Sequence, residues 1–235
     1  MDTSVSQTQP SSLLRKATLL IACVLLLVIL AAWLVPKTIA LYQQMKAGKI
    51  INGISQINNT NTPNDLPCAR AALTNSQEID QVQIAIKRLS LALKLDSHFA
   101  KAQFLLGQAY CLTGEANSAV TAFEKYNQLR PRNPLGHIEL ALAIEYRCLI
   151  SMPSSGSTVA EKVNRDISFP YCRTETDTGK VIDEWKAAGV QPSQLAGVGN
   201  YNFKNKNYDV AIRWYQRSLL LEPTNNQTIN DLGII

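Results

Sequence analysis

The sequence predicts an all-α protein, in which one N-terminal transmembrane helix precedes a short superhelix of paired antiparallel helices. Two observations predict this fold class. An apolar run without charges lies near the N-terminus, and a 34-residue pattern of large and small apolar residues recurs after it. Repeats of this length fold as helix-turn-helix units, each of which buries its apolar face by stacking on the next unit.

Residues 1–16 are predicted to be a disordered tail, because the first nine are rich in Ser, Thr and Gln and show no apolar period. Residues 17–35 follow, nineteen residues without a charge. At a rise of about 1.5 Å per residue, this run matches the hydrocarbon core of a bilayer. Lys16 and Lys37 flank the run, and Trp33 lies where an indole can reach the headgroups. We therefore expect a single-pass transmembrane helix.

Two other interpretations of this run have less support. A cleaved signal peptide usually has an apolar core of about 7 to 15 residues and a small-residue cleavage site, whereas this run is longer and lacks a good site. The residues from Leu20 to Cys23 also resemble a lipoprotein cleavage box, but the apolar run continues for twelve residues after Cys23. A membrane-buried cysteine is therefore favoured.

The orientation of the span is left open by charge counting, because basic residues flank both of its ends. A short N-terminal tail usually stays in the cytoplasm, and four of the five cysteines follow the apolar run. Both features favour a soluble domain on the non-cytoplasmic side of the membrane.

Residues 36–64 are expected to form a juxtamembrane helix and a linker, and residues 65–235 a repeat domain. The linker is predicted from the segment INNTNTPND, which combines four Asn residues with a proline and favours turns. An incomplete first repeat follows it. Its second helix contains Ala85, 34 residues before Ala119, and its first helix is expected around residues 66–75.

The clearest copy of the repeat runs from Ala100 to Asn133. Counted from Ala100, large residues stand at positions 7, 11 and 24, small ones at 8 and 20, and a proline at 32: Leu106, Tyr110, Phe123, Gly107, Ala119 and Pro131. The small residues let two antiparallel helices touch, the large ones fill the seam, and the proline ends the second helix. This arrangement resembles the tetratricopeptide-repeat (TPR) family, and the chain as a whole resembles a membrane-anchored TPR protein of bacterial type.

The last full copy of the repeat covers residues 192–225. Leu232 and Gly233 then fall at positions 7 and 8 of a further first helix, so the described pattern ends on apolar residues. A solenoid normally ends in a polar capping helix. We therefore expect either that the array continues beyond Ile235, or that another protein or the membrane covers this end.

An insertion of about 24 residues breaks the period at about residues 151–178. Cys148 and Cys172 stand 24 residues apart at its two ends, so a disulfide between them would close the insertion and contribute about 3 kcal/mol in an oxidising compartment. The alternative is that Cys111 and Cys148 are small buried hydrophobic residues. Because no C-x-x-C pair or metal-ligand spacing occurs, neither a metal nor a cofactor is expected.

The resemblance also implies a binding surface. In TPR proteins, positions 2, 5, 9, 12 and 13 of each first helix line the concave face. We call the corresponding residues the first-helix face; its members are Lys101, Phe104, Gln108, Cys111, Leu112, Leu135, Ile138, Leu142, Glu145, Tyr146, Ser193, Ala196, Asn200, Phe203 and Lys204. Most are apolar, which suits a helix or an extended segment of a protein partner. The alternative is that the chain's own linker or insertion fills part of this face.

Other functions find little support in the sequence. The 23 Lys and Arg against 18 Asp and Glu give a net charge of +5 without a dense basic stripe, so nucleic acid binding is not expected. Neither His98 nor His137 has a Ser or Cys nearby in a nucleophile context. Glu139 and Glu145 are six residues apart, which places them on different faces of one helix. We expect structural histidines, solvated glutamates, no catalytic site and no small-molecule substrate.

These features predict a non-catalytic, membrane-anchored TPR scaffold or adaptor that binds a protein partner at the membrane surface, in the assembly or retention of a membrane or envelope complex. Anchoring raises the effective concentration of the domain for a membrane neighbour. The alternative is a permanent accessory subunit of a larger integral membrane complex, whose span packs against other spans through small residues such as Ala31 and Ala32. An enzyme would need a catalytic domain beyond Ile235.

Overall fold

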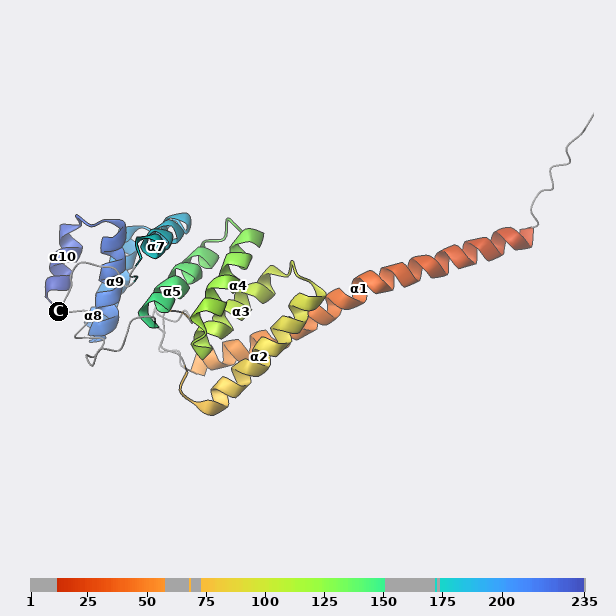
Figure 1. The fold of residues 1–235 in the computed structure, drawn as a ribbon, viewed down its shortest axis with the longest axis horizontal. Helices are drawn as coiled ribbons and strands as arrows, with labels where there is room; N and C mark the ends of the chain where they lie inside the picture. Colours follow the sequence, from red (N-terminus) through yellow and green to blue (C-terminus); the bar gives the residue numbers. More distant parts are fainter. Residues whose placement is uncertain (1–11, 58–67, 69–72, 151–171, 173, 235) are drawn as a thin grey trace, which may run out of the picture.

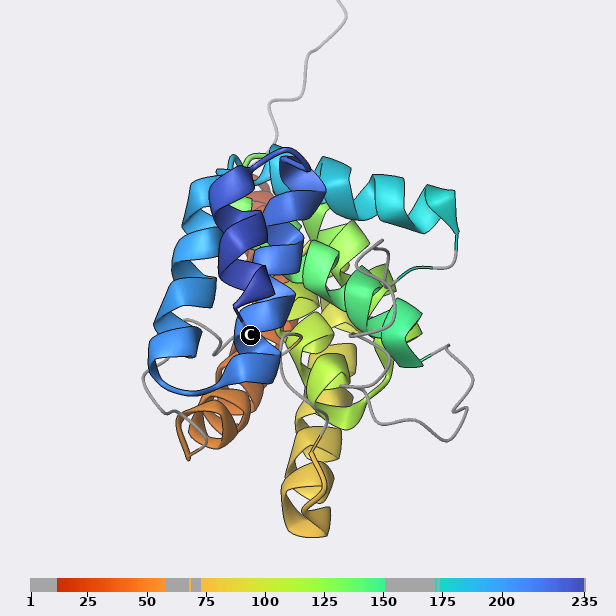
Figure 2. The same cartoon turned by 90° about the vertical axis from the view of Figure 1, so that its left-hand side faces the viewer.

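The structure is a computed structural model that describes residues 12–57, 68, 73–150, 172 and 174–234, and all regular structure within these residues is helical. The helices are α1 Ser12–Ile57, α2 Ser76–Leu95, α3 Ala100–Thr113, α4 Ala116–Leu129, α5 Pro134–Ile150, α7 Glu175–Ala187, α8 Pro192–Lys204, α9 Tyr208–Leu221 and α10 Asn226–Gly233. Figure 1 shows α1 projecting from one end of a stack of the other helices. Figure 2 views the stack from its C-terminal end, with α8, α9 and α10 nearest the viewer. The predicted all-α fold class is confirmed.

Helix α1 is continuous over 46 residues and contains the whole apolar run. Pro36 lies inside it, and the helix is formed on both sides of this residue. By length and composition Leu19–Ile54 is a candidate membrane span, with a mean hydropathy of 3.0 in its most apolar window. The helix begins at Ser12, so residues 12–16, which we expected in the disordered tail, are helical. Residues 1–11 lie outside the described part.

The C-terminal half of α1 packs against α2 and α3. Ala40, Ala47 and Ile51 are each at most 1% exposed and belong to one apolar cluster with Val82 and Leu89 of α2. This half of α1 therefore takes the place of the first helix of the first pair, and the apolar helix enters the stack without an intervening linker. The helix expected around residues 66–75 is not formed at residues 73–75, and apart from residue 68 its other positions lie outside the described part.

Two of the helix pairs meet at a glycine. A Cβ atom added to Gly107 of α3 would lie 2.6 Å from the ring of Phe123 in α4, and one added to Gly199 of α8 would lie 2.7 Å from the ring of Tyr215 in α9. Positions 8 and 24 are thus in direct contact in both copies, as the register predicts. Both α4 and α9 end two residues before the proline at position 32 of their copy.

Helix α7 is the second helix of the pair that starts with α5. It begins at Glu175, inside the range expected for the insertion, because Thr174 caps it: the Thr174 Oγ1 accepts a hydrogen bond from the main-chain N–H of Asp177 at 3.1 Å. Capping of this kind satisfies one of the free N–H groups at a helix start. The remainder of the expected insertion, apart from Cys172, lies outside the described residues.

Two apolar clusters hold the stack together. The first joins α1 to α4 and includes Ile51 and Leu89, and the second runs from α3 to α9 and includes Phe123, Ile144 and Trp185. Each of these side chains is at most 2% exposed. Burial of one such side chain contributes about 1.5–3 kcal/mol. Helices α3 and α4 contribute buried residues to both clusters, as expected for repeats that bury their faces against their neighbours.

Candidate protein-binding surface

The structure divides the first-helix face by exposure. Its exposed members are Lys101, Leu135, Ser193, Asn200 and Lys204, its partly buried members are Phe104, Gln108, Ile138, Tyr146, Ala196 and Phe203, and its buried members are Cys111, Leu112, Leu142 and Glu145. The buried members lie in the C-terminal halves of α3 and α5. The N-terminal ends of these two helices keep their part of the face open to solvent.

The chain itself covers the C-terminal half of the face on α3. Cys68 forms a disulfide with Cys111, and the main-chain N–H of Leu73 donates to the carbonyl oxygen of Leu112 at 2.9 Å. Leu112 is 3% exposed and Leu142 of α5 is 1% exposed. Two residues that precede α2 therefore lie against this part of the face. This arrangement matches the alternative in which the chain fills part of its own surface.

A buried carboxylate lies beside this cover. Glu139 of α5 is 0% exposed, and its Oε1 accepts a hydrogen bond from Nε2 of Gln108 at 2.9 Å. Burial raises the pKa of Glu139 to about 7, against the lowering effect of the bonds from Gln108 and from the main-chain N–H of Cys68. No hydrogen-bond partner for Oε2 exists among the described residues. Gln108, expected to contact a partner, is instead engaged within the chain.

Glu145 belongs to a second buried network, which joins α5, α7 and α9. Its Oε2 pairs with Nη2 of Arg217 at 2.7 Å, and both side chains are 7% exposed. Its Oε1 accepts a hydrogen bond from Nε1 of Trp185 at 3.2 Å. The guanidinium of Arg217 also lies 4.4 Å from the ring centre of Trp214. Glu145, assigned to the first-helix face, therefore points into the protein.

Our expectation that Glu139 and Glu145 are solvated was wrong, because they are 0% and 6% exposed. The two residues do lie on different faces of α5, as the helical period requires. However, α5 is packed against α4 and α7, and nine of its seventeen residues are buried. A helix enclosed on several sides buries residues of more than one face.

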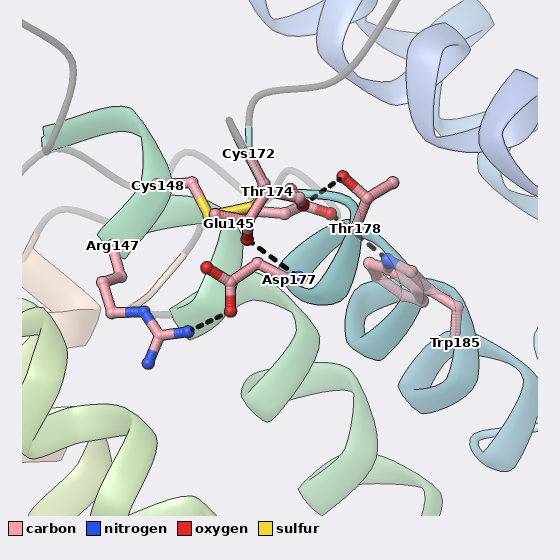
Figure 3. The surroundings of a disulfide bond; sticks show 8 residues. All are labelled: Glu145, Arg147, Cys148, Cys172, Thr174, Asp177, Thr178 and Trp185. Carbon is pink, nitrogen blue, oxygen red and sulfur yellow. Dashed lines mark hydrogen bonds and ion pairs between the residues drawn. A yellow bond between two sulfur atoms is a disulfide. The ribbon is translucent and has the colours of Figure 1, made fainter.

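The two ends of the insertion are joined by a second disulfide, between Cys148 near the end of α5 and Cys172 just before α7. Figure 3 shows this bond beside the ion pair of Arg147 and Asp177, whose Nη2 and Oδ1 atoms are 2.8 Å apart. Both cysteines are buried, at 5% and 2% exposure. The covalent bond and the ion pair fix the start of α7 against the end of α5.

His137 ties the turn after α4 to α7. Its Nε2 lies 2.9 Å from the carbonyl oxygen of Pro131, and its Nδ1 lies 2.6 Å from Oε2 of Glu184. Burial lowers the pKa of His137. The bonds to Pro131 and Glu184, together with the negative charge of Glu184, raise it by a larger amount, so the net pKa is above the ordinary value. Both partners are acceptors, so they favour the protonated ring. These contacts hold His137 between the α4–α5 turn and α7.

A cavity of about 330 Å³ opens between α3 and α4, and its lining residues are Gln103, Leu106, Tyr110, Asn117, Ser118, Thr121, Ala122 and Lys125. None of them belongs to the first-helix face. In the described part of the chain, no group of three or more His, Cys, Asp or Glu side chains is placed to hold a metal ion. The accessible part of the first-helix face therefore comprises the N-terminal ends of α3 and α5, around Lys101, Phe104, Leu135 and Ile138, together with Ser193, Asn200 and Lys204 of α8.

The comparisons with known proteins give matches among solved structures. No family model and no curated protein matches the sequence. Among solved structures 21 chains match, and one of them is described as "Crystal structure of MamA". This chain is 17% identical to it, the match covers 67% of this chain and 78% of that chain, and the TM-score is 0.38. The assignment of a TPR-type fold rests on the helix pairs and their register.

Proposed function

We propose that the protein is a non-catalytic scaffold, anchored by α1 in a membrane, which holds a protein partner on the N-terminal half of its first-helix face. The observation that carries this proposal is the continuity of α1, whose apolar part and whose contacts with α2 belong to one helix. A partner bound to the stack would therefore be kept close to the bilayer. This restriction raises the effective concentration of the domain for membrane neighbours.

The accessible residues support a protein as the ligand. Leu135 is 41% exposed at the start of α5, and Ile138 one turn later is partly buried against the core. Phe104 stacks against Phe123 and Tyr126, with ring centres 5.7 and 5.0 Å apart, and leaves part of its ring at the surface. Apolar side chains that are anchored in a core and partly open suit the apolar face of a helix or an extended segment.

We place the stack on the non-cytoplasmic side of the membrane, because disulfides persist in oxidising compartments. Two disulfides join four cysteines of the stack, and Cys23 in the apolar part of α1 is free. Protease added to intact cells stripped of their outer barriers is expected to digest the stack and leave the N-terminal tail intact. Digestion of the tail alone would show that the stack lies on the cytoplasmic side, opposite to the proposed orientation.

Photo-crosslinking in native membranes tests the binding surface. A photoreactive amino acid at Leu135 is expected to give a defined adduct with one protein, whereas the same group at Glu124, an exposed residue of α4 outside the first-helix face, is expected to give none. Equal adducts from both positions, or adducts from Glu124 alone, would contradict the proposed surface. If the adduct partner also co-purifies stoichiometrically through high salt in detergent, the protein is a permanent subunit and not a transient scaffold.

A further inference from the structure

The contact between α1 and α2 sets the height of the stack above the apolar run. Nη1 of Arg88 donates to Oε1 of Gln43 at 3.0 Å, which places these two residues side by side in antiparallel helices. From this contact α2 runs seven residues to its end at Leu95, and α1 runs seven residues back to Pro36. Seven residues of helix span about 10 Å. The end of α2 is therefore level with Pro36, and Figure 1 shows it beside α1.

The corner between α2 and α3 consequently lies at the depth of lipid headgroups. The apolar run ends at Val35, and a headgroup layer extends roughly 5–8 Å beyond the hydrocarbon core. We call residues 94–101 the α2–α3 corner. Four of its side chains are exposed: Lys94, Ser97, His98 and Lys101. They stand where phosphate groups would lie.

Basic residues outnumber acidic ones at this level of the molecule. Lys37 of α1 and Lys94 and Lys101 of the corner lie close to the level of Pro36, and residues 94–101 contain a single carboxylate, Asp96. One oxygen of Asp96 already accepts a hydrogen bond from the main-chain N–H of His98 at 3.1 Å. The opposite ends of the same helices carry acidic residues instead, such as Glu78 at the start of α2 and Glu115 before α4. Positive charge therefore outweighs negative charge at the α2–α3 corner.

An indole lies below the corner on the same side of α1. Trp33 precedes Ala40 by seven residues, so it shares the face of α1 on which Ala40 and Ala47 are buried against the stack. Trp33 is 60% exposed, and the Nζ of Lys37 lies 3.6 Å from its ring centre. Aromatic rings paired with Lys are typical of membrane interfaces, where the ring lies against the apolar boundary and the ammonium reaches the polar headgroups.

We propose that the α2–α3 corner is a second membrane contact, which binds the headgroups of anionic phospholipids through Lys94 and Lys101; Lys101, at the edge of the first-helix face, then contacts lipid and not the protein partner. This inference rests on the proposed anchoring of α1 in a membrane. A zwitterionic surface gives the basic corner little electrostatic attraction, whereas an anionic surface attracts nearby Lys and Arg side chains. The contact holds the stack against the bilayer on the side of Trp33 and fixes its orientation about the axis of α1.

Depth-dependent quenching tests the contact in the full-length protein. An environment-sensitive fluorescent amino acid replaces Ser97, and the protein is reconstituted in vesicles of phosphatidylcholine, alone or mixed with phosphatidylglycerol, with a trace of headgroup spin-labelled lipid. We expect quenching that is stronger in the phosphatidylglycerol mixture and that decreases with salt, because salt screens exposed charges. Quenching that is absent, or equal in both vesicles, would overturn the proposal.

Charge reversal supplies the matched comparison. The double variant Lys94→Glu/Lys101→Glu is expected to lose the phosphatidylglycerol-dependent quenching. Arg130→Glu/Arg132→Glu makes the same charge change at exposed positions of the α4–α5 turn, farther along the stack, and is expected to retain it. Equal loss in both variants would show a general charge effect and overturn the specific contact. Circular dichroism checks that both variants keep their helix content.

Carbonate extraction separates this proposal from the anchoring on which it rests. If alkaline carbonate releases the protein from the vesicles, α1 does not span the bilayer, and both proposals are wrong. If the protein is retained while Ser97 remains unquenched, only the corner contact is wrong. Crosslinking from Leu135 reports on the partner surface independently of either result.

Discussion

Helix α5 carries two buried carboxylates that the protein treats in opposite ways. Glu139, in the central part of the stack, is held by the amide of Gln108, and no cation of the described residues pairs with it. Glu145, near the C-terminal pair α8 and α9, is held by Arg217 and the indole of Trp185. Apolar contacts hold both regions, and in the C-terminal region a buried ion pair between α5 and α9 adds to them. The attachment of the last pair to the rest of the stack therefore depends on a charged contact as well as on apolar packing.

The polar character of the last pair extends beyond this ion pair. Asn202 stands at position 11, where the central copy has Tyr110, and it is 0% exposed with its Nδ2 donating to the carbonyl oxygen of Val198 at 2.8 Å. Ser218 of α9 is also fully buried and donates to the carbonyl oxygen of Pro192 at 2.8 Å. A buried polar group is stable only while its partner remains in place. The last pair should therefore be the more sensitive to single polar substitutions.

The largest effect is expected from Arg217→Met, which leaves Glu145 charged and buried without its cation. Removing one partner of a buried pair costs about 3–5 kcal/mol. Urea unfolding of the detergent-solubilised protein, followed by tryptophan fluorescence, measures the loss, since Trp185 and Trp214 lie in this network. A loss below about 1 kcal/mol would mean that the ion pair does not hold α9 to α5.

Two further variants separate the ion pair from general effects of substitution on α9. Arg213→Met changes a partly exposed residue of the same helix and is expected to stay within about 0.5 kcal/mol of the wild type. Glu145→Gln/Arg217→Met removes both charges and keeps an acceptor for the Trp185 indole. It is expected to recover most of the stability lost by Arg217→Met, because no unpaired charge remains.

The next effect concerns Glu139 and pH. Its pKa rises from 4.5 to about 7 on folding, so its contribution is fully present below about pH 4.5 and is lost as the pH rises through 7. This shift corresponds to about 3 kcal/mol. Glu139→Gln, a neutral isostere of the protonated acid, should lack this dependence. The unfolding free energy of the wild type relative to the variant is expected to fall by about 3 kcal/mol between pH 4.5 and 8; a constant difference would refute the buried, uncompensated carboxylate.

A smaller effect is expected at the apolar seam of the central pair. Gly107→Ala adds a Cβ that would lie 2.6 Å from the Phe123 ring, so the ring or the helices must shift. Overpacking of this kind costs about 1–3 kcal/mol. Gly197→Ala in α8 is the control, because a Cβ there meets nothing within 4 Å and alanine stabilises a helix by about 0.5–1 kcal/mol. If thermal unfolding shows Gly107→Ala to be more stable than Gly197→Ala, the close contact between Gly107 and Phe123 is wrong.

The smallest effect is expected from Tyr215→Phe, which makes the last pair resemble the central pair at position 24. The Tyr215 hydroxyl donates to Oδ1 of Asn200 at 2.7 Å, and loss of such a bond costs about 0.5–1.5 kcal/mol. Because Asn200 is exposed, water can replace the hydroxyl as its partner. A loss of several kcal/mol of unfolding free energy in urea would show that this hydrogen bond stabilises the last pair more than the apolar contact of Phe123 stabilises the central pair.

The 34-residue register was enough to predict the paired helices, because it depends on local spacing. Gly107 contacts the ring of Phe123 and Gly199 contacts the ring of Tyr215, each sixteen residues later in the sequence, as the register predicts. The role of α1 was not predicted. The 34-residue register assumes a short turn between the two helices of a pair. Because residues 58–75 separate α1 from α2, the first helix of the first pair does not stand at the position that the register assigns to it.

The candidate surface was harder to predict, since what covers it comes from distant parts of the chain. Cys68 and Cys111 are 43 residues apart, and no local pattern links them. Arg217 lies 72 residues after Glu145, in another repeat. A pairwise contact of this kind is set by how the repeats stack, and a repeat consensus contains no information about it.

The unbroken course of α1 has a mechanical consequence. A transmembrane helix adapts to the thickness of its bilayer by tilting. If α1 is inserted as proposed, its apolar part and the first pair tilt together, because one helix forms both, and the far end of the stack travels the greatest distance. The position of α10 above the lipid would then report the thickness of the membrane in which the protein resides.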